Sequence, residues 1–207
     1  MNYSEEQLYG EEVLDFVRTS ADYCSVLEQA DKMKLKDLVD QLHKLLSKLY
    51  YTATNLSELD SQFEDLVQKF VSEQDYELIR NKLLVKFGQY DAYEEVFDEE
   101  RVEFEDSVGE SISEDLTDIY QDLKDFIKLF ELGTNEVMYE ALWECKQSFQ
   151  SFWGQKVCNV LRPLHSLRYS DEDLEENTFN KKENANFKSM DTDNWIIKKR
   201  QEDYRNE

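Results

Sequence analysis

The apolar residues of this 207-residue chain recur three or four positions apart along most of its length. That spacing places them on one face of an α-helix, which has about 3.6 residues per turn. The chain has five glycines and one proline, too few for the tight turns of a β-sandwich or the glycine-rich loops of a nucleotide-binding α/β enzyme. The sequence therefore predicts an all-α fold, a compact multi-helix bundle of about six helices.

The predicted helices begin near Ser4, Leu35, Ser61, Ser72, Ser113 and Asn135. We expect the fourth to end at Gly88, because glycine takes the left-handed backbone conformation that terminates many helices. The fifth ends before Gly133. The sixth has the widest apolar face, so we expect it to lie centrally and to run to about Leu167. Pro163 should kink this helix or end it in the preceding turn.

Two regions depart from the helical pattern. Residues 89–112 are predicted to form an irregular acidic loop held by aromatic anchors, because no strong partner strand is apparent. Residues 169–207 are polar and form a C-terminal extension beyond the helical domain of residues 1–168. We predict that the extension docks on the body through the apolar cluster Trp195, Ile196 and Ile197, since an exposed apolar patch invites association. The basic residues 198–200 would then lie beside the acidic loop at 94–106.

The charge balance restricts the partners of the chain. It has 47 acidic and 24 basic residues, a formal net charge of −23. That charge repels phosphate backbones and anionic membranes, so we expect neither nucleic acid nor a membrane surface as a partner. The three cysteines, Cys24, Cys145 and Cys158, are widely spaced, and the first residues do not resemble a secretory signal. A reduced, soluble, cytoplasmic protein is the expectation.

Metal and cofactor motifs are poorly matched. The cysteines and histidines lack zinc-ligand spacing, and a single Asp40-x-x-His43 falls short of the paired motifs of a di-iron bundle. The acidic run at 171–175 is followed by Glu176, where a calcium loop needs glycine. We therefore expect no bound cofactor.

One enzyme alternative remains open. All-α nucleotide pyrophosphohydrolases bind Mg²⁺ through a Glu-Glu-x-x-Glu motif and a later Glu-x-x-Asp motif on neighbouring helices. Here Glu94, Glu95 and Asp98 precede Asp115 and Asp118 at similar spacing, and carboxylates are the oxygen ligands that Mg²⁺ prefers. Such short motifs also arise by chance in an acidic chain.

Four polar residues of the fifth and sixth predicted helices form a second candidate. If these helices pack together, Arg162 or His165 meets Asp115 or Asp122, and the pair Arg162–Asp122 is the one we predict. An inter-helix ion pair of this kind is more often structural than catalytic. Cys158 lies seven residues before His165, about 10 Å along a helix axis, so these two cannot form a nucleophile–base pair.

Three segments carry a family resemblance: YEEVFD at 93–98, SEDLTDIYQDLKDF at 113–126 and FWGQKVCNVLRPLH at 152–165. They resemble the signature blocks, DLADIY-DL and WG…LR-LH, of an uncharacterised bacterial family of all-helical domains of unknown function. The resemblance covers about residues 5–168. It implies a helical fold and no particular activity. Phe152 and Lys156 flank the Trp-Gly pair where relatives often carry histidine, which speaks against histidine-based chemistry here.

The sequence therefore favours a non-enzymatic interaction or regulatory protein that binds a basic protein, because complementary charge speeds encounter and selects partners. The first alternative is the Mg²⁺-dependent phosphohydrolase. The second is an acidic mimic of nucleic acid, which would need carboxylates spaced like phosphates along one face.

Overall fold

Helices make up most of the chain in the computed structural model, as the sequence predicts. The structure describes residues 6–61, 68–94, 109–170 and 174. They belong to one unit, Met1–Glu175. The helices are α1 (Glu6–Tyr9), α2 (Glu11–Glu28), α3 (Leu35–Thr54), α4 (Glu73–Phe87), α5 (Ile112–Leu132), α6 (Asn135–Ser148) and α7 (Gly154–Tyr169), with 3₁₀ turns at Ala30–Lys32 and Gly88–Tyr90.

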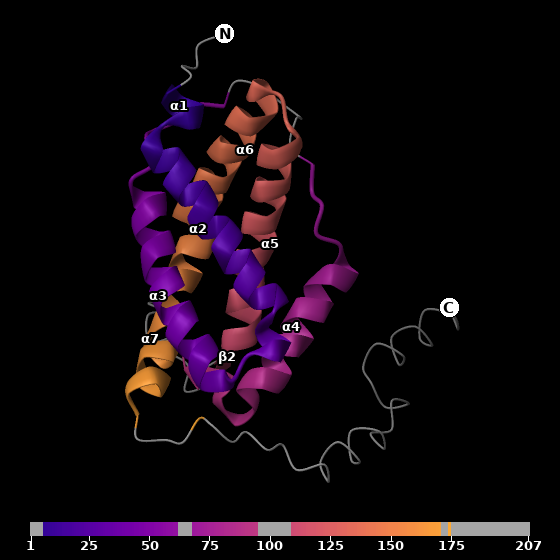
Figure 1. Cartoon of the computed structure of the whole chain (residues 1–207), viewed down its shortest axis with the longest axis vertical. Coiled ribbons are helices and arrows are strands. Elements are labelled where there is room, and N and C mark those ends of the chain that lie inside the picture. The colour runs from indigo at the N-terminus through magenta and orange to yellow at the C-terminus, as the bar shows by residue number, and fades with distance from the viewer. Residues whose placement is uncertain (1–5, 62–67, 95–108, 171–173, 175–207) are drawn as a thin grey trace, which may run out of the picture. The chain divides into compact units, whose positions relative to one another are not determined.

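Helix α5 lies at the centre of the bundle. It packs against α2, α4, α6 and α7, while α3 packs against α2 and α7, and Figure 1 shows the long helices side by side with α4 crossing beside α5. Its buried apolar residues are Ile112, Leu116, Ile119, Tyr120, Leu123, Phe126, Ile127 and Leu129. This is the face that the three-four spacing predicts for the fifth helix, so the local pattern sets which side of α5 turns inward.

The sixth predicted helix is interrupted at a point that its apolar pattern does not mark. It begins at Asn135 as expected, but Phe149–Trp153 form a π-helical segment between α6 and α7. Helix α7 continues through Pro163 to Tyr169 instead of ending before the proline. Burial of Val160 and Leu164 on either side of Pro163 offsets the backbone hydrogen bond that proline cannot make.

Both ends of α4 follow the sequence signals. Ser72 and Asp75 form a reciprocal capping box at the start of α4, in which each side chain accepts a backbone N–H of the other residue. Gly88 ends the helix with a φ of 53°, a backbone angle that residues with a Cβ rarely adopt.

The acidic loop predicted at 89–112 is partly a hairpin. Strand β1 (Ala92–Glu94) pairs antiparallel with β2 (Gly109–Ser111), with Tyr93 opposite Glu110. The expectation of an unpaired segment is wrong for these six residues, because strands this short carry no recognisable alternation in the sequence. The hairpin brings β1 to the first residue of α5.

Several predictions concern residues outside the described ranges. They are the helix start at Ser4, the helix after Ser61 and the anchor Trp195–Ile196–Ile197. The division at residue 168 stays a prediction, and beyond it Leu174 lies buried against the core. Every helix in the described ranges is too short or too polar to span a lipid bilayer.

Candidate functional site

Two aspartates of α5 share one lysine of α7. Lys156 Nζ lies 2.8 Å from Asp115 Oδ1 and 2.9 Å from Asp118 Oδ2. The Asp115 side chain is only 2% exposed, and those of Asp118 and Lys156 are 22% and 21% exposed. Asp115 and Asp118 are three apart on α5, so their side chains lie close enough for one ammonium group to bridge them.

Tyrosines complete the hydrogen bonding of this cluster, which we call the Asp115–Lys156 network. The Tyr93 hydroxyl donates to Asp115 Oδ2, and the Tyr76 hydroxyl donates to Asp118 Oδ1 at 2.7 Å. These tyrosines come from β1 and α4. Four elements therefore meet at the network, and each carboxylate has both a charged and a neutral partner, as a buried carboxylate requires.

Electrostatics favour a stable ion pair over a reactive acid. Burial raises the pKa of Asp115, against the opposing effect of its hydrogen bonds from Lys156 and Tyr93. The pKa of Lys156 lies above its usual value, because the bonds and charges of Asp115 and Asp118 outweigh its desolvation. Lys156 therefore stays protonated at neutral pH and compensates the buried aspartate.

The first turn of α5 holds another buried carboxylate. Asp91 accepts hydrogen bonds from the backbone N–H of Ser113 at 2.8 Å and the Ser111 hydroxyl at 2.6 Å. A carboxylate at a helix N-terminus satisfies free N–H groups and is stabilised by the helix dipole. Asp91 thus has a structural explanation, and the hairpin places it there.

The magnesium set predicted from the sequence does not fit this arrangement. Lys156 occupies the place between Asp115 and Asp118 that a cation would take. Glu95 and Asp98 lie outside the described residues, as does the side chain of Glu94. Within the described ranges, no three His, Cys, Asp or Glu side chains converge as metal ligands.

The predicted pair between Arg162 and Asp122 is replaced by other contacts. Asp122 accepts a hydrogen bond from the Ser148 hydroxyl of α6. Arg162 is exposed on α7, and its side chain has no carboxylate of the described residues within ion-pair distance. The pairing is wrong because α7 presents Lys156, six residues before Arg162, to α5. Lys156 lies four residues before the buried Val160, a spacing that could have indicated its inward position.

His165 finds a partner that the sequence did not suggest. Its ring lies 5.5 Å from that of His43 on α3, measured between centroids, and 4.7 Å from Tyr169. Arg168 is 2.9 Å from His43 Nδ1 and 2.5 Å from Asp40. Burial, Arg168 and His165 lower the pKa of His43. These contacts join α3 to the end of α7, where the positive charge of Arg168 disfavours a bound cation.

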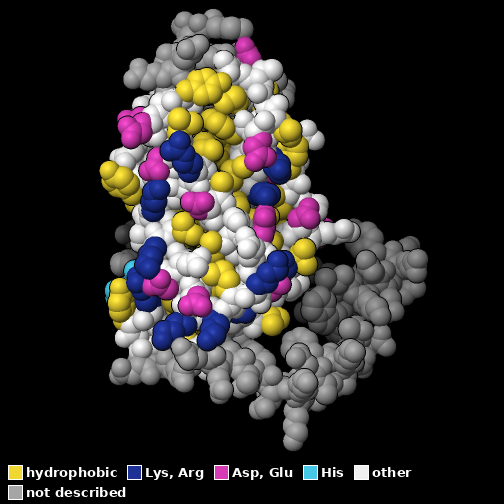
Figure 2. Space-filling model, in the orientation of Figure 1, with side chains coloured by type: hydrophobic (Ala, Val, Ile, Leu, Met, Phe, Trp, Pro, Cys, Tyr) yellow, Lys and Arg dark blue, Asp and Glu magenta, His cyan; other side chains and the backbone are white. Residues whose placement is uncertain are grey.

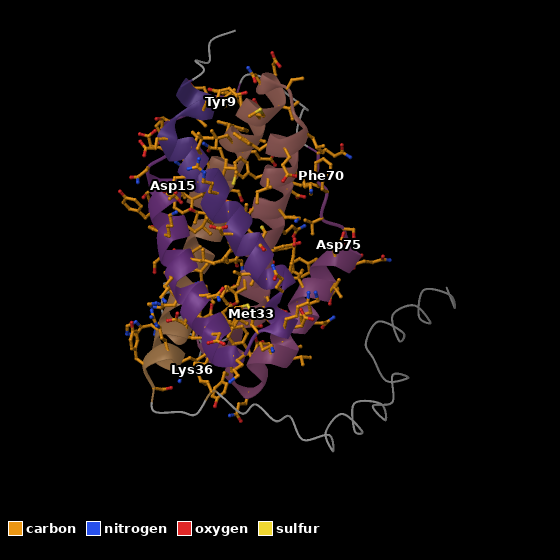
Figure 3. All side chains as sticks on the ribbon, in the orientation of Figure 1. Tyr9, Asp15, Met33, Lys36, Phe70 and Asp75 are labelled. Atoms are coloured by element: carbon orange, nitrogen blue, oxygen red, sulfur yellow. The ribbon has the colours of Figure 1, made fainter. Side chains whose placement is uncertain are left out.

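An acidic groove of about 320 Å³ lies between the start of α2 and the end of α3. It is lined by Glu11, Glu12, Asp15, Arg18, Tyr51, Thr52 and Asn55. Figure 3 shows Asp15 on the side of the molecule where these helices meet. Asp15 pairs with Lys48 at 2.8 Å, Glu11 and Glu12 are exposed, and Tyr51 is 64% exposed. The groove therefore offers carboxylates beside an open aromatic ring.

Comparison with known proteins gives a family without an assigned activity. The family model of DUF5063, a domain of unknown function, matches residues 7–170. The crystal structure of protein BF1032 from Bacteroides fragilis, a structural genomics target, is 36% identical in sequence, with a TM-score of 0.71. The match covers 80% of this chain and 98% of that one. A search of curated proteins returned no match.

Proposed function

Since this chain belongs to the DUF5063 family of domains of unknown function, its function has to follow from its own side chains, and we propose that it is a non-enzymatic interaction protein that binds a basic protein. The acidic groove between α2 and α3 is the observation that carries this proposal. Its carboxylates attract lysine and arginine side chains, and the exposed ring of Tyr51 can receive a cation over its face.

The local sequence explains why the groove keeps its charge. Glu11 and Glu12 stand in the first turn of α2, where the helix dipole stabilises carboxylates without a basic partner. Two exposed acidic residues at the start of a helix, taken alone, are an ordinary solvated helix end. The exposed Tyr51 opposite them adds the amphipathic surface that protein interfaces favour.

The geometry of the Asp115–Lys156 network supports binding over catalysis. A phosphohydrolase would need carboxylates free to hold Mg²⁺, whereas those of Asp115 and Asp118 are bound to a lysine and two tyrosines. The network therefore stabilises the end of the bundle that α4, α5 and α7 share.

Binding of a fluorescent deca-lysine peptide tests the proposal. We expect binding that weakens steeply with salt, since the attraction is between exposed charges. Glu11→Gln with Glu12→Gln should weaken it about tenfold, a loss of about 1.4 kcal/mol. The matched control, Asp22→Asn with Glu131→Gln, changes the net charge equally on other exposed parts of the surface and should have little effect.

Equal weakening by both double variants would mean that the negative charge of the whole protein attracts the peptide. The proposal that the peptide binds in the acidic groove would then be wrong. Mg²⁺-dependent hydrolysis of nucleoside triphosphates by the purified protein would favour the enzyme alternative instead. Competition with DNA for a captured DNA-binding protein would favour the acidic mimic.

A further inference from the structure

A cavity the size of a water molecule lies beside α5 and α6. Its volume is about 20 Å³, enough for one water or one ion of similar size. Three carboxylates, Asp122, Asp125 and Glu144, line it together with the ammonium group of Lys69. The cavity is separate from the acidic groove, and a ligand could occupy it whether or not the groove binds a basic protein.

Asp125 points an unsatisfied oxygen at this cavity. Its side chain is 3% exposed, and its Oδ1 accepts the backbone N–H groups of Phe70 and Val71 at 2.7 and 2.9 Å. Its Oδ2 has no hydrogen-bond partner among the described residues. A buried carboxylate oxygen without a donor is costly, so such a group indicates a missing partner.

Lys69 leaves the cavity only partly neutralised. Its Nζ lies 3.3 Å from Glu144 but 3.9 Å from Asp125 Oδ2, which is beyond hydrogen-bond distance. The Lys69 side chain is 57% exposed, so its ammonium group sits at the mouth of the cavity and binds the outermost carboxylate. Three carboxylates therefore line the cavity with one ammonium group, and Asp125 Oδ2 has no hydrogen-bond donor among the described residues.

We propose that this cavity binds a primary ammonium group, carried by a small amine or by a lysine side chain of a peptide. Such a group is the size of a water molecule, is positive, and has three N–H donors. Asp125 Oδ2 supplies an acceptor without a donor, and Asp122 and Glu144 add negative charge beside it. A guanidinium group is too large for the cavity, and within the described ranges the carboxylates do not converge as metal ligands. Lys69 acts as a competitor at the mouth.

Thermal unfolding of the full chain tests the site. In 200 mM methylammonium chloride we expect a Tm at least about 2 °C higher than in 200 mM KCl, because a ligand that binds only the folded state stabilises it. Lys69→Met removes the competitor and should enlarge this difference. Asp125→Asn should abolish it, since its amide replaces the acceptor with a donor while keeping the carbonyl that Phe70 and Val71 need.

Glu144→Gln provides a second variant should Asp125→Asn unfold the protein, and it should reduce the difference between the salts. The control Glu131→Gln alters an exposed carboxylate elsewhere and should retain it. Equal Tm values in the two salts for both wild type and Lys69→Met would overturn the proposal, as would an undiminished difference in Glu144→Gln. Nα-acetyl-lysine amide then identifies the source: an equal shift shows that lysine side chains enter, and a shift with methylammonium alone assigns the site to small amines.

Discussion

At the scale of single residues, Lys156 compensates the buried negative charge of Asp115 on α5. Asp115 is almost fully buried, and without its ammonium partner the carboxylate would have to be protonated or remain uncompensated. The hydroxyls of Tyr93 and Tyr76 donate hydrogen bonds but bring no positive charge. The network therefore depends on this lysine more than on any of its neutral members.

Replacement of Lys156 by methionine should destabilise the protein by about 3–5 kcal/mol, the usual cost of leaving one charge of a buried pair alone. Lys128→Met is the control, because Lys128 pairs with Glu131 on the surface and such pairs contribute about 0–1 kcal/mol. Urea unfolding of both variants gives the comparison. Equal losses would show that the network contributes no more than a surface pair.

The same variant should change the dependence of stability on pH. Burial raises the pKa of Asp115, so the folded state favours the protonated form. That contribution is largest below the ordinary pKa of aspartate and is lost as pH rises through the folded value. Because Lys156 opposes the rise, Lys156→Met should lose less stability relative to wild type at pH 5 than at pH 7, as unfolding at the two pH values will measure.

Gly154 is a second residue whose identity the structure explains, because there is no room for a Cβ at this position. A Cβ built there would lie 2.4 Å from the carbonyl oxygen of Phe149 and 2.9 Å from its ring. The π-helical segment brings Phe149 this close, and Trp153 beside it is fully buried, with its indole N–H donating to the carbonyl of Cys145 at 3.2 Å. The Trp-Gly pair of the family block thus has a packing role in this chain.

Gly154→Ala should therefore destabilise the protein by about 2 kcal/mol, as overpacking does in well-packed interiors. Gly109 is the matched control, because a Cβ there meets no atom within 4 Å among the described residues. Chemical denaturation of Gly154→Ala and Gly109→Ala will compare them. A smaller loss at Gly154 than at Gly109 would mean that the π-helical segment yields to the extra methyl group.

At the scale of elements, α4 buries a smaller share of its residues than α5 does. It buries Ile79, Leu83 and Phe87, while Leu78 and Val85 are 56% and 70% exposed. The central α5, by contrast, is packed on several sides. Elements with few buried contacts open locally at low free energy. We therefore infer that the amides of α4 exchange with solvent faster than those of α5.

Removing the cap should loosen α4 selectively. Ser72→Ala deletes the hydroxyl that accepts the Asp75 N–H, at a cost of about 1 kcal/mol. Hydrogen exchange of α4 amides should then quicken about fivefold, with α5 unchanged. Ser47→Ala is the control, because the exposed Ser47 hydroxyl donates only to the carbonyl oxygen of His43, one turn earlier in α3. Equal acceleration in α5 would show that the two helices open as one unit.

At the scale of the molecule, the face that Figure 2 draws carries Lys and Arg side chains along its length, with several of them grouped at its lower end. Lys86 donates to the carbonyl of Met33 at 2.6 Å, and Lys82 donates to that of Glu28 at 3.3 Å. Cations beside the last carbonyls of a helix are favourable. These lysines thus hold α4 against the end of α2 and the turn that follows it.

The docking of the C-terminal extension stays a prediction for the whole chain. If Trp195 packs on the body, its fluorescence, taken as the difference between wild type and Trp195→Phe, should be blue-shifted and shielded from iodide. The difference removes the emission of Trp143 and of Trp153, which is fully buried. A difference spectrum typical of solvated indole, equally quenched in the folded and unfolded protein, would show that the extension is free.

The sequence by itself determined where most helices lie and which faces they bury. The helical spacing that begins near Leu35, the start of α4 after Ser72, its end at Gly88 and the inward face of α5 are all local, because helix periodicity and capping involve residues within a few positions of one another. The family blocks likewise indicated a helical domain. These features needed no knowledge of what packs against what.

Only the tertiary structure decided which side chains meet. Lys156 rather than Arg162 reaches Asp115, His43 meets His165, and Asp125 accepts N–H groups from Phe70 and Val71. Each such pairing depends on how far one helix is rotated and shifted along another, and that arrangement is set by the sum of many small packing contacts. A pattern of residue types along the chain carries no record of that sum, so the charges could be counted from the sequence but not paired.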